Sequence, residues 1–247
     1  MHFINYLMGK FPFTFKQFSI NQDRCAMKIG TDGVLLGAWA TTAQNLNSVL
    51  DIGAGTGLLS LMLAQRCHAE ILDALEIDSD AYEQCVENFE QSPWGDRLFC
   101  YHASLEEFTN EIDDKYDLIV CNPPFYSEDY KANNKQRAMA RFQDAMPFNQ
   151  LTKAVAKLLS PSGIFSVIIP FKEESRFITL AANFNLFPNR ITHVKGSPNS
   201  EIKRSLIEFS FVRPHSEINK ELLIIETSRH QYTKNYINLT KDFYLKM

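Results

Sequence analysis

Four consecutive residues, Asn122-Pro123-Pro124-Phe125, have the clearest chemical potential in this chain. They follow residues 116–121, an apolar run with the length and composition of a buried strand. Because proline has no backbone N–H, two prolines cannot continue a sheet ladder, and the strand is predicted to end at Asn122. The result is a rigid corner with an amide, a free carbonyl and an aromatic ring. It lies at the carboxyl end of a strand, where open α/β sheets bind ligands.

Such a corner suits a weakly nucleophilic amine on an aromatic ring. The exocyclic amine of adenine is a poor nucleophile because its lone pair is delocalised into the ring. The side-chain oxygen of Asn122 and the carbonyl of Pro123 would accept its two N–H bonds and draw the lone pair out of conjugation, while Phe125 would stack on the base. The simpler interpretation is a turn that ends a strand and exposes a phenylalanine, so the elements upstream decide between the two.

The first upstream element is a strand followed by a glycine loop and a helix. The loop is Gly53-Ala54-Gly55-Thr56-Gly57, between a strand over 48–52 and a helix over 58–64. Its G-x-G-x-G spacing differs from the dinucleotide fingerprint G-x-G-x-x-G, and the preceding Asp51 would repel a diphosphate. An acidic group suits a cation instead, and S-adenosylmethionine (SAM) carries a sulfonium, an α-ammonium and no phosphate. We therefore expect Asp51, Gly53, Ala54 and Gly55 to contact SAM.

The next two strand ends are expected to complete the cofactor site. The first carries Glu76 and Asp78, and an acidic residue at this place binds ribose hydroxyls in such folds. We assign Glu76 to the ribose, with Asp78 as the alternative, and Ile77 to the side of the adenine ring. The strand over 98–102 is followed by Ser104, and with no aspartate nearby, Ser104 or the backbone is expected to face the cofactor's adenine.

A polar segment, Lys28-Ile29-Gly30-Thr31-Asp32-Gly33, precedes the first of these strands. Thr31 or Asp32 is predicted to cap a helix that starts there. Lys28, beside the helix start, would meet a ligand carboxylate, although a solvated lysine is the simpler interpretation. We also assign Asp32 to the cofactor site, as well as Asn122, which is thus expected to contact both the cofactor and the target amine.

Basic residues gather in two segments after the corner. The polar stretch 126–145 is longer than ordinary connections and is interpreted as a substrate lid or a disordered insertion. The lid is favoured because its basic residues cluster in the second half. A turn-rich loop separates strands predicted over 190–194 and 205–212. The residues assigned to nucleic acid are Lys131, Lys135, Arg137, Arg141, Lys195, Lys203 and Arg204.

Both ends of the chain are rich in aromatic residues. Residues 1–30 are predicted to form short strands that pack, as an aromatic-rich lead-in, on one domain over 31–247. The carboxy-terminal tail interleaves tyrosines with lysines, a pattern typical either of RNA contact or of a docked amphipathic end.

Composition narrows the class of protein. The chain has 247 residues, 45% of them hydrophobic, which is ample for a buried core. Its net charge of −4 disfavours a non-specific nucleic-acid coat and requires any basic face to be local. Five scattered cysteines without a C-x-x-C pair argue against zinc and disulfides and for a reducing compartment. We see no signal peptide and no run of membrane-spanning length.

These features together resemble the class I SAM-dependent methyltransferases. The resemblance rests on Asp51 to Gly57, on Glu76 and on Asn122-Pro123-Pro124-Phe125, a form shared by members that methylate amino groups. It implies a Rossmann-like α/β fold with a seven-stranded, mostly parallel sheet, one antiparallel strand, and helices on both faces. The missing acidic residue near Ser104 departs from the commoner pattern of the superfamily.

Three further segments are similar to the bacterial tRNA1(Val) adenine N6-methyltransferases. These are Phe15-Lys16-Gln17-Phe18, the segment from Lys28 to Gly33, and the tail, with Tyr232 to Tyr236 and Leu239 to Tyr244. The resemblance implies methyl transfer from SAM to N6 of adenine-37, beside the anticodon of a valine tRNA, by a cytoplasmic monomer without metal.

Three other functions are compatible with the same residues. A guanine-N2 methyltransferase acting on ribosomal RNA would use the same corner. A protein glutamine methyltransferase would too, but it has no need of the basic segments. A SAM-binding RNA chaperone or assembly factor without turnover would have no need of Asn-Pro-Pro-Phe.

Overall fold

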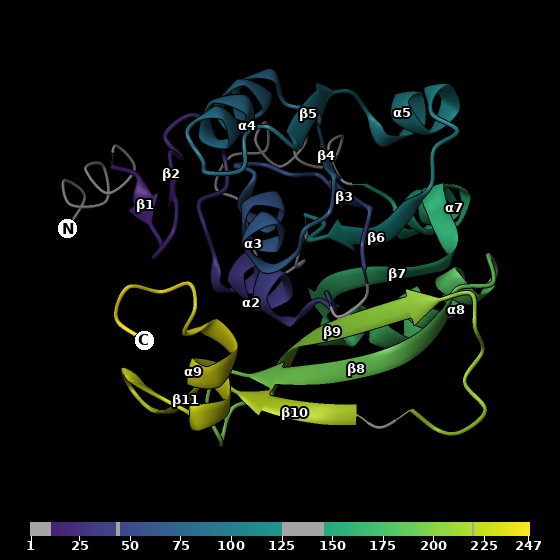
Figure 1. Cartoon of the computed structure of the whole chain (residues 1–247). Helices are drawn as coiled ribbons and strands as arrows, with labels where there is room; N and C mark the ends of the chain where they lie inside the picture. The colour runs from purple at the N-terminus through teal and green to yellow at the C-terminus, as the bar shows by residue number, and fades with distance from the viewer. Residues whose placement is uncertain (1–10, 43–44, 125–145, 219) are drawn as a thin grey trace, which may run out of the picture.

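Within the described part of the chain, an eight-stranded sheet forms the centre of the computed structural model (Figure 1). The structure describes residues 11–42, 45–124, 146–218 and 220–247. The strands of the sheet are β3 (Ser48–Ile52), β4 (Ile71–Glu76), β5 (Leu98–His102), β6 (Tyr116–Cys121), β7 (Leu159–Pro170), β8 (Phe187–Lys195), β9 (Ile202–Ser210) and β10 (Lys220–Ile224). Their order across the sheet is β10-β8-β9-β7-β6-β3-β4-β5.

The direction of the strands confirms the predicted fold class. Strand β9 runs antiparallel to both neighbours, β7 and β8, and the other pairs in the sheet are parallel. The predicted number of seven strands is wrong by one, because β10 adds a further parallel strand beside β8. This strand begins with Lys220 and Glu221, and so short a run with two charges gives no clear strand signal in the sequence.

Helices cover both faces of the sheet (Figure 1). They are α2 (Thr31–Trp39), α3 (Leu58–Arg66), α4 (Ser79–Glu90), α5 (Leu105–Glu111), α7 (Phe148–Leu158), α8 (Glu174–Ala182) and α9 (Lys234–Thr240), with a 3₁₀ turn η1 (Phe171–Glu173). Helices α2, α3 and α4 pack in one hydrophobic cluster, and α5, α7 and α8 pack in the other. Strand β6 shows why: Leu118 and Val120 face the first cluster, whereas Ile119 and Cys121 face the second.

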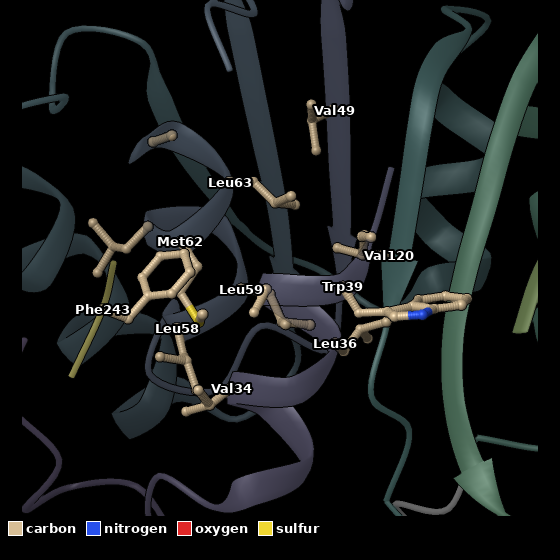
Figure 2. Packing of buried hydrophobic residues seen from close by; sticks show 14 of the residues in the cluster. Val34, Leu36, Trp39, Val49, Leu58, Leu59, Met62, Leu63, Val120 and Phe243 are labelled. Atoms are coloured by element: carbon tan, nitrogen blue, oxygen red, sulfur yellow. The ribbon is translucent and has the colours of Figure 1, made fainter. Parts of the chain in front are cut away.

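The first cluster joins the two ends of the chain to the centre of the fold. Figure 2 shows its members from α2 and α3, such as Leu36 and Met62, together with Phe243 from the tail. The lead-in contributes a hairpin of β1 (Phe13–Thr14) and β2 (Ser19–Ile20), and the backbone N–H of Lys16 donates to the carbonyl of Phe243 over 2.8 Å. Burying a side chain such as Phe243 contributes about 1.5–3 kcal/mol relative to exposure.

The tail is therefore docked at its aromatic residues Tyr236 and Phe243, both of which are buried. It contains the short strands β11 (Glu226–Ser228) and β12 (Gln231–Tyr232) before α9. The tail was interpreted either as an RNA contact or as a docked amphipathic end, and these two side chains are docked. None of the helices described is long and apolar enough to cross a membrane.

Two local predictions were wrong. Helix α2 begins after Gly30 with no side-chain cap, so neither Thr31 nor Asp32 caps it. The run Pro161-Ser162-Gly163 predicts a turn, but these residues lie inside β7 as an irregularity, because Tyr116 pairs with Leu159 and Leu118 with Ile164. Gly163 makes this possible: a Cβ there would lie 2.9 Å from the backbone oxygen of Tyr116.

Candidate active site

The predicted corner lies at the end of a central strand. Strand β6 ends at Cys121 as predicted, and Cys121 pairs with Ile52 of β3 on one side and Val167 of β7 on the other. Asn122 is half-buried and Pro123 is buried. A Cβ added to Gly33 would lie 3.9 Å from Nδ2 of Asn122, so the amide lies against the start of α2. Phe125 lies outside the described residues, so its stacking role stays a prediction.

The glycine loop leaves open space where the cofactor is expected. A Cβ on Gly53 or Gly55 would meet no atom within 4 Å among the described residues. All three glycines have a positive φ, which disfavours other residues, but Gly57 differs in its surroundings, because a Cβ there would lie 2.5 Å from the ring of Phe89. The loop is thus held tightly against α4 at Gly57 and stays open at Gly53 and Gly55.

Glu76 lies beside this loop with its carboxylate held by backbone donors. It accepts hydrogen bonds from the N–H groups of Gly55 at 2.7 Å and of Ile77 and Asp78 at 2.9 Å. Ile77 is 60% exposed, an unusual place for an apolar side chain and one that suits contact with a base. Asp78 instead caps α4 by accepting the N–H of Ala81. The geometry favours Glu76 over Asp78 for the ribose.

Asp51 is fully buried and only partly satisfied. Its Oδ2 accepts from the N–H and the hydroxyl of Ser60 at 3.2 and 2.8 Å, whereas Oδ1 has no partner among the described residues. Burial raises the pKa of Asp51 to about 7, against the lowering effect of the Ser60 bonds. A buried carboxylate oxygen without a partner fits a cationic ligand that supplies the missing interaction.

Ser104, which follows the end of β5, acts as the N-cap of helix α5. The hydroxyl of Ser104 donates to Oε2 of Glu107 and accepts the Glu107 N–H, which forms a capping box at the start of α5. A contact of Ser104 with the cofactor's adenine therefore stays a prediction. His102 binds the carbonyl of Ile77 at 3.1 Å and stacks on Tyr82, which agrees with a structural role.

The structure gives Lys28 and Asp32 partners within the protein. The ammonium of Lys28 donates to the carbonyls of Gln22 and Cys25. Asp32 accepts from Nε of Arg204 at 2.7 Å, which ties the start of α2 to β9. The cofactor role assigned to Asp32 and the RNA role assigned to Arg204 thus fall on two groups that bind each other.

The predicted RNA residues divide into two groups. Lys131, Lys135, Arg137 and Arg141 lie outside the described residues. Lys195 ends β8, and Lys203 at the start of β9 is exposed beside Glu201, with 4.0 Å between the charged atoms. Since Arg204 pairs with Pro170, this group lies at the edge of the sheet where β7 ends.

Two buried amides on α4 are functional residues that the sequence reasoning missed. Asn88 donates from Nδ2 to the carbonyls of Thr56 and Asn21, both at 2.9 Å, and accepts the N–H of Asn21 at 2.8 Å. Gln84 accepts the N–H of Arg24 at 3.1 Å. The lead-in is thereby fastened to the glycine loop through α4. The available signal was two amides four residues apart on the apolar face of an amphipathic helix.

Replacing Asn88 by leucine is expected to raise KM for SAM about tenfold with a smaller change in kcat, because one hydrogen bond to the glycine loop and two to the lead-in that packs beside it are lost. Steady-state kinetics with SAM varied at saturating RNA measures the effect. Asn110→Leu, on the exposed side of α5, is the matched control and should leave KM for SAM unchanged. Equal values for both variants would contradict the positioning role.

Comparison with known families and relatives agrees with this arrangement. The family described as "Methyltransferase small domain" matches residues 29–178. A protein of Flavobacterium johnsoniae named tRNA1(Val) (adenine(37)-N6)-methyltransferase is 65% identical over 95% of this chain and all of its own length. Proteins with the same name from Christiangramia forsetii and Pseudoalteromonas translucida are 58% and 42% identical, over 97% and 95% of this chain and 100% and 99% of their own lengths.

Solved structures show the same fold at low sequence identity. A predicted O-methyltransferase from Agrobacterium tumefaciens aligns with a TM-score of 0.67 at 17% identity, over 86% of this chain and 96% of its own. A putative RNA methyltransferase from Pyrococcus horikoshii aligns with a TM-score of 0.53 at 18% identity, over 75% of this chain and 82% of its own.

Proposed function

Because the chain belongs to the tRNA1(Val) (adenine(37)-N6)-methyltransferase family, we propose that it transfers a methyl group from SAM to N6 of adenine-37 in tRNA1(Val). The observation that carries the proposal is the Asn122 corner at the end of β6, next to β3 and its glycine loop. Relatives with this name are between 42% and 65% identical to the chain over almost its whole length.

The chain's own residues fit SAM. When bound, SAM supplies an electrophilic methyl group on a sulfonium. Glu76 would hold the ribose and Ile77 the side of the adenine, above the open positions of Gly53 and Gly55. Oδ1 of Asp51, which has no hydrogen-bond partner in the part of the chain that the structure describes, suits the cationic end of the cofactor.

The protein's part in the transfer is mostly positioning. Oδ1 of Asn122 and the carbonyl of Pro123 would accept hydrogen bonds from the two N–H groups of the target amine. These bonds would draw the lone pair of the amine out of conjugation with the ring. An amine held in this way would be positioned to take the methyl group that SAM supplies, with S-adenosylhomocysteine as the leaving group, and its proton would leave after the N–C bond has formed, so no general base is required beforehand. A well-oriented pair of reactants gains much of its rate from this alignment alone. The target base has to leave the anticodon-loop stack to reach the corner.

Asp51 predicts a pH dependence of SAM binding. Its pKa of about 7 in the unliganded protein should fall when a cation binds, so affinity should rise about tenfold between pH 6 and pH 8. The ammonium group of SAM also titrates, but it affects the wild-type protein and Asp51→Asn equally. The pH dependence of SAM affinity in Asp51→Asn should therefore lack only the part due to Asp51. Isothermal titration of both proteins across this range measures the difference. Identical profiles would contradict the assignment.

The effect of Asp51 on folding stability has the opposite pH dependence to its effect on SAM affinity. The pKa of this carboxyl is near 3.8 when unfolded and about 7 when folded, so the folded protein retains the proton longer. The contribution of Asp51 to the free energy of unfolding therefore falls as pH rises from about 4 to about 7.

The test of the function uses SAM with a labelled methyl group and an unmodified tRNA1(Val) transcript. Labelled N6-methyladenosine, lost when adenine-37 is replaced by guanine, is the expected result. Label in ribosomal RNA guanine or in a protein glutamine, without label in tRNA, would contradict it. We also propose a monomeric enzyme without a metal, since Asn122, Pro123 and Glu76 lie at strand ends of a single sheet. The five free cysteines suit a cytoplasmic one.

A further inference from the structure

The segment after β7 presents an aromatic ring and a lysine for which the proposed transfer has no use. Phe171 and Lys172 open η1 directly after Pro170, the last residue of β7. Because β7 pairs with β6 in parallel, with Val167 opposite Cys121, both strands end at the same edge of the sheet. The Phe171 segment therefore lies at the same edge as the Asn122 corner, beyond the three residues by which β7 extends past Val167.

We propose that Phe171 and Lys172 form an RNA-binding surface that holds a nucleotide flanking the target adenine. The proposal rests on the proposed function and names a substrate contact beyond the corner itself. The ring would stack on the flanking base, and the ammonium would neutralise a neighbouring phosphate. Stacking on aromatic side chains and phosphate neutralisation together are how proteins hold single-stranded RNA.

Phe171 is exposed but firmly supported. The ring is 39% exposed, and its centroid lies 5.0 Å from the imidazole of His193 at an interplanar angle of 80°. This edge-to-face contact with a residue of β8 holds the Phe171 ring against the sheet. An exposed ring held in this way is a ready platform for a flat base.

His193 is itself fixed by a buried carboxylate. Glu174 accepts from Nε2 of His193 at 2.7 Å, from the hydroxyl of Ser205 at 2.6 Å and from the ammonium of Lys220 at 2.8 Å. Burial alone would raise the pKa of Glu174, but these donors outweigh it and lower the pKa. Donors from β8, β9 and β10 thus converge on α8 directly behind Phe171, which makes its support rigid.

The charges around Phe171 favour a polyanion. Lys172 is exposed and has no hydrogen bond or ion pair with the residues described. Lys195 lies two residues after His193 on β8 and so shares its face of the sheet. The nearby Glu173 pairs with Arg176 at 3.3 Å, which neutralises it. A local positive excess beside an aromatic ring suits RNA even though the whole chain carries −4.

The experiment compares Phe171→Leu and Lys172→Gln with the wild-type protein on the unmodified tRNA1(Val) transcript. Phe171→Leu should raise KM for tRNA by roughly fivefold to 100-fold, the range expected for one lost stacking contact. KM for SAM should stay within about twofold of wild type. Phe171→Trp restores a ring and should recover most of the affinity. Lys172→Gln should weaken tRNA binding and reduce its salt dependence by about one phosphate contact.

Phe99→Leu is the matched control. Phe99 is 44% exposed on the edge strand β5, four positions from β7 in the sheet, and its replacement should leave both KM values unchanged. Unchanged KM for tRNA in Phe171→Leu would overturn the proposal. So would an equal rise in KM for SAM and tRNA with a lower melting temperature, because that pattern indicates lost packing.

The two proposals fail in distinguishable ways. Wild-type protein that transfers no methyl group to tRNA would contradict the proposed function. The surface is then judged by direct binding of a labelled RNA hairpin, which Phe171→Leu has to weaken and Phe99→Leu has to leave intact. Loss of binding to a protein substrate with unchanged RNA binding would overturn the RNA assignment.

Discussion

Replacing Asn122 by alanine is expected to reduce the rate of methyl transfer by about 10²- to 10³-fold while SAM still binds. The amide oxygen is the acceptor that would orient the amine and restore its lone pair, and loss of one preorganised polar group at a reacting centre costs about 10²–10³ in kcat. The side chain lies at the end of β6 against α2, and Glu76 is held separately by the glycine loop. Single-turnover transfer to tRNA, with SAM affinity from calorimetry, measures both effects.

Asn122→Asp is the informative companion. It keeps an oxygen acceptor of the same size and should therefore retain more activity than Asn122→Ala. Near-normal transfer by the alanine variant would rule out the proposed positioning of the amine. A loss of SAM affinity as large as the loss of rate would instead assign Asn122 to the cofactor.

Replacing Glu76 by glutamine is expected to raise KM for SAM about 10²-fold while kcat at saturating SAM changes little. The carboxylate accepts three backbone N–H bonds, and an amide would place N–H donors opposite some of them. The variant also loses charge-assisted bonds to the ribose, each of which contributes about 1.5–3 kcal/mol. Initial rates over a wide range of SAM concentrations separate KM from kcat.

Asp78→Asn provides the matched control two residues away. Asparagine caps a helix about as well as aspartate, so α4 should start as before and KM for SAM should stay near the wild-type value. If Asp78→Asn raised KM as much as Glu76→Gln, the ribose assignment would have to move to Asp78.

Local sequence signals located the elements that build the edge of the sheet. The predicted strands over 48–52, 98–102 and 116–121 coincide with β3, β5 and β6, and the amphipathic pattern of residues 79–90 predicts a helix that is observed as α4. These elements have a clear hydrophobic periodicity and are ended by distinctive residues, such as the two prolines after β6. Both signals are local and do not depend on a partner distant in the sequence. The open glycine loop and the carboxylate of Glu76 at the end of β4 follow from the same signals.

Where the prediction stopped short, a partner distant in the sequence was decisive. Asp32 was assigned to the cofactor and Arg204 to RNA, yet they bind each other across 172 residues. Strand β10 has little strand character of its own and forms because β8 offers a free edge. The amides of Asn88 and Gln84 look like ordinary helix residues until the lead-in folds over them.

The type of fold, the strand end at Asn122 and the positions of the acidic groups proposed for the cofactor site could therefore be predicted from the sequence, because they depend on spacing along one segment. Tertiary structure alone decided which polar groups are already satisfied within the protein and which are left for a ligand. Asp51 retains a buried oxygen without a partner in the described structure, whereas Ser104 and Asp78 are engaged as helix caps. Hydrogen bonds and burial depend on where distant segments meet, and spacing along the chain does not contain that information.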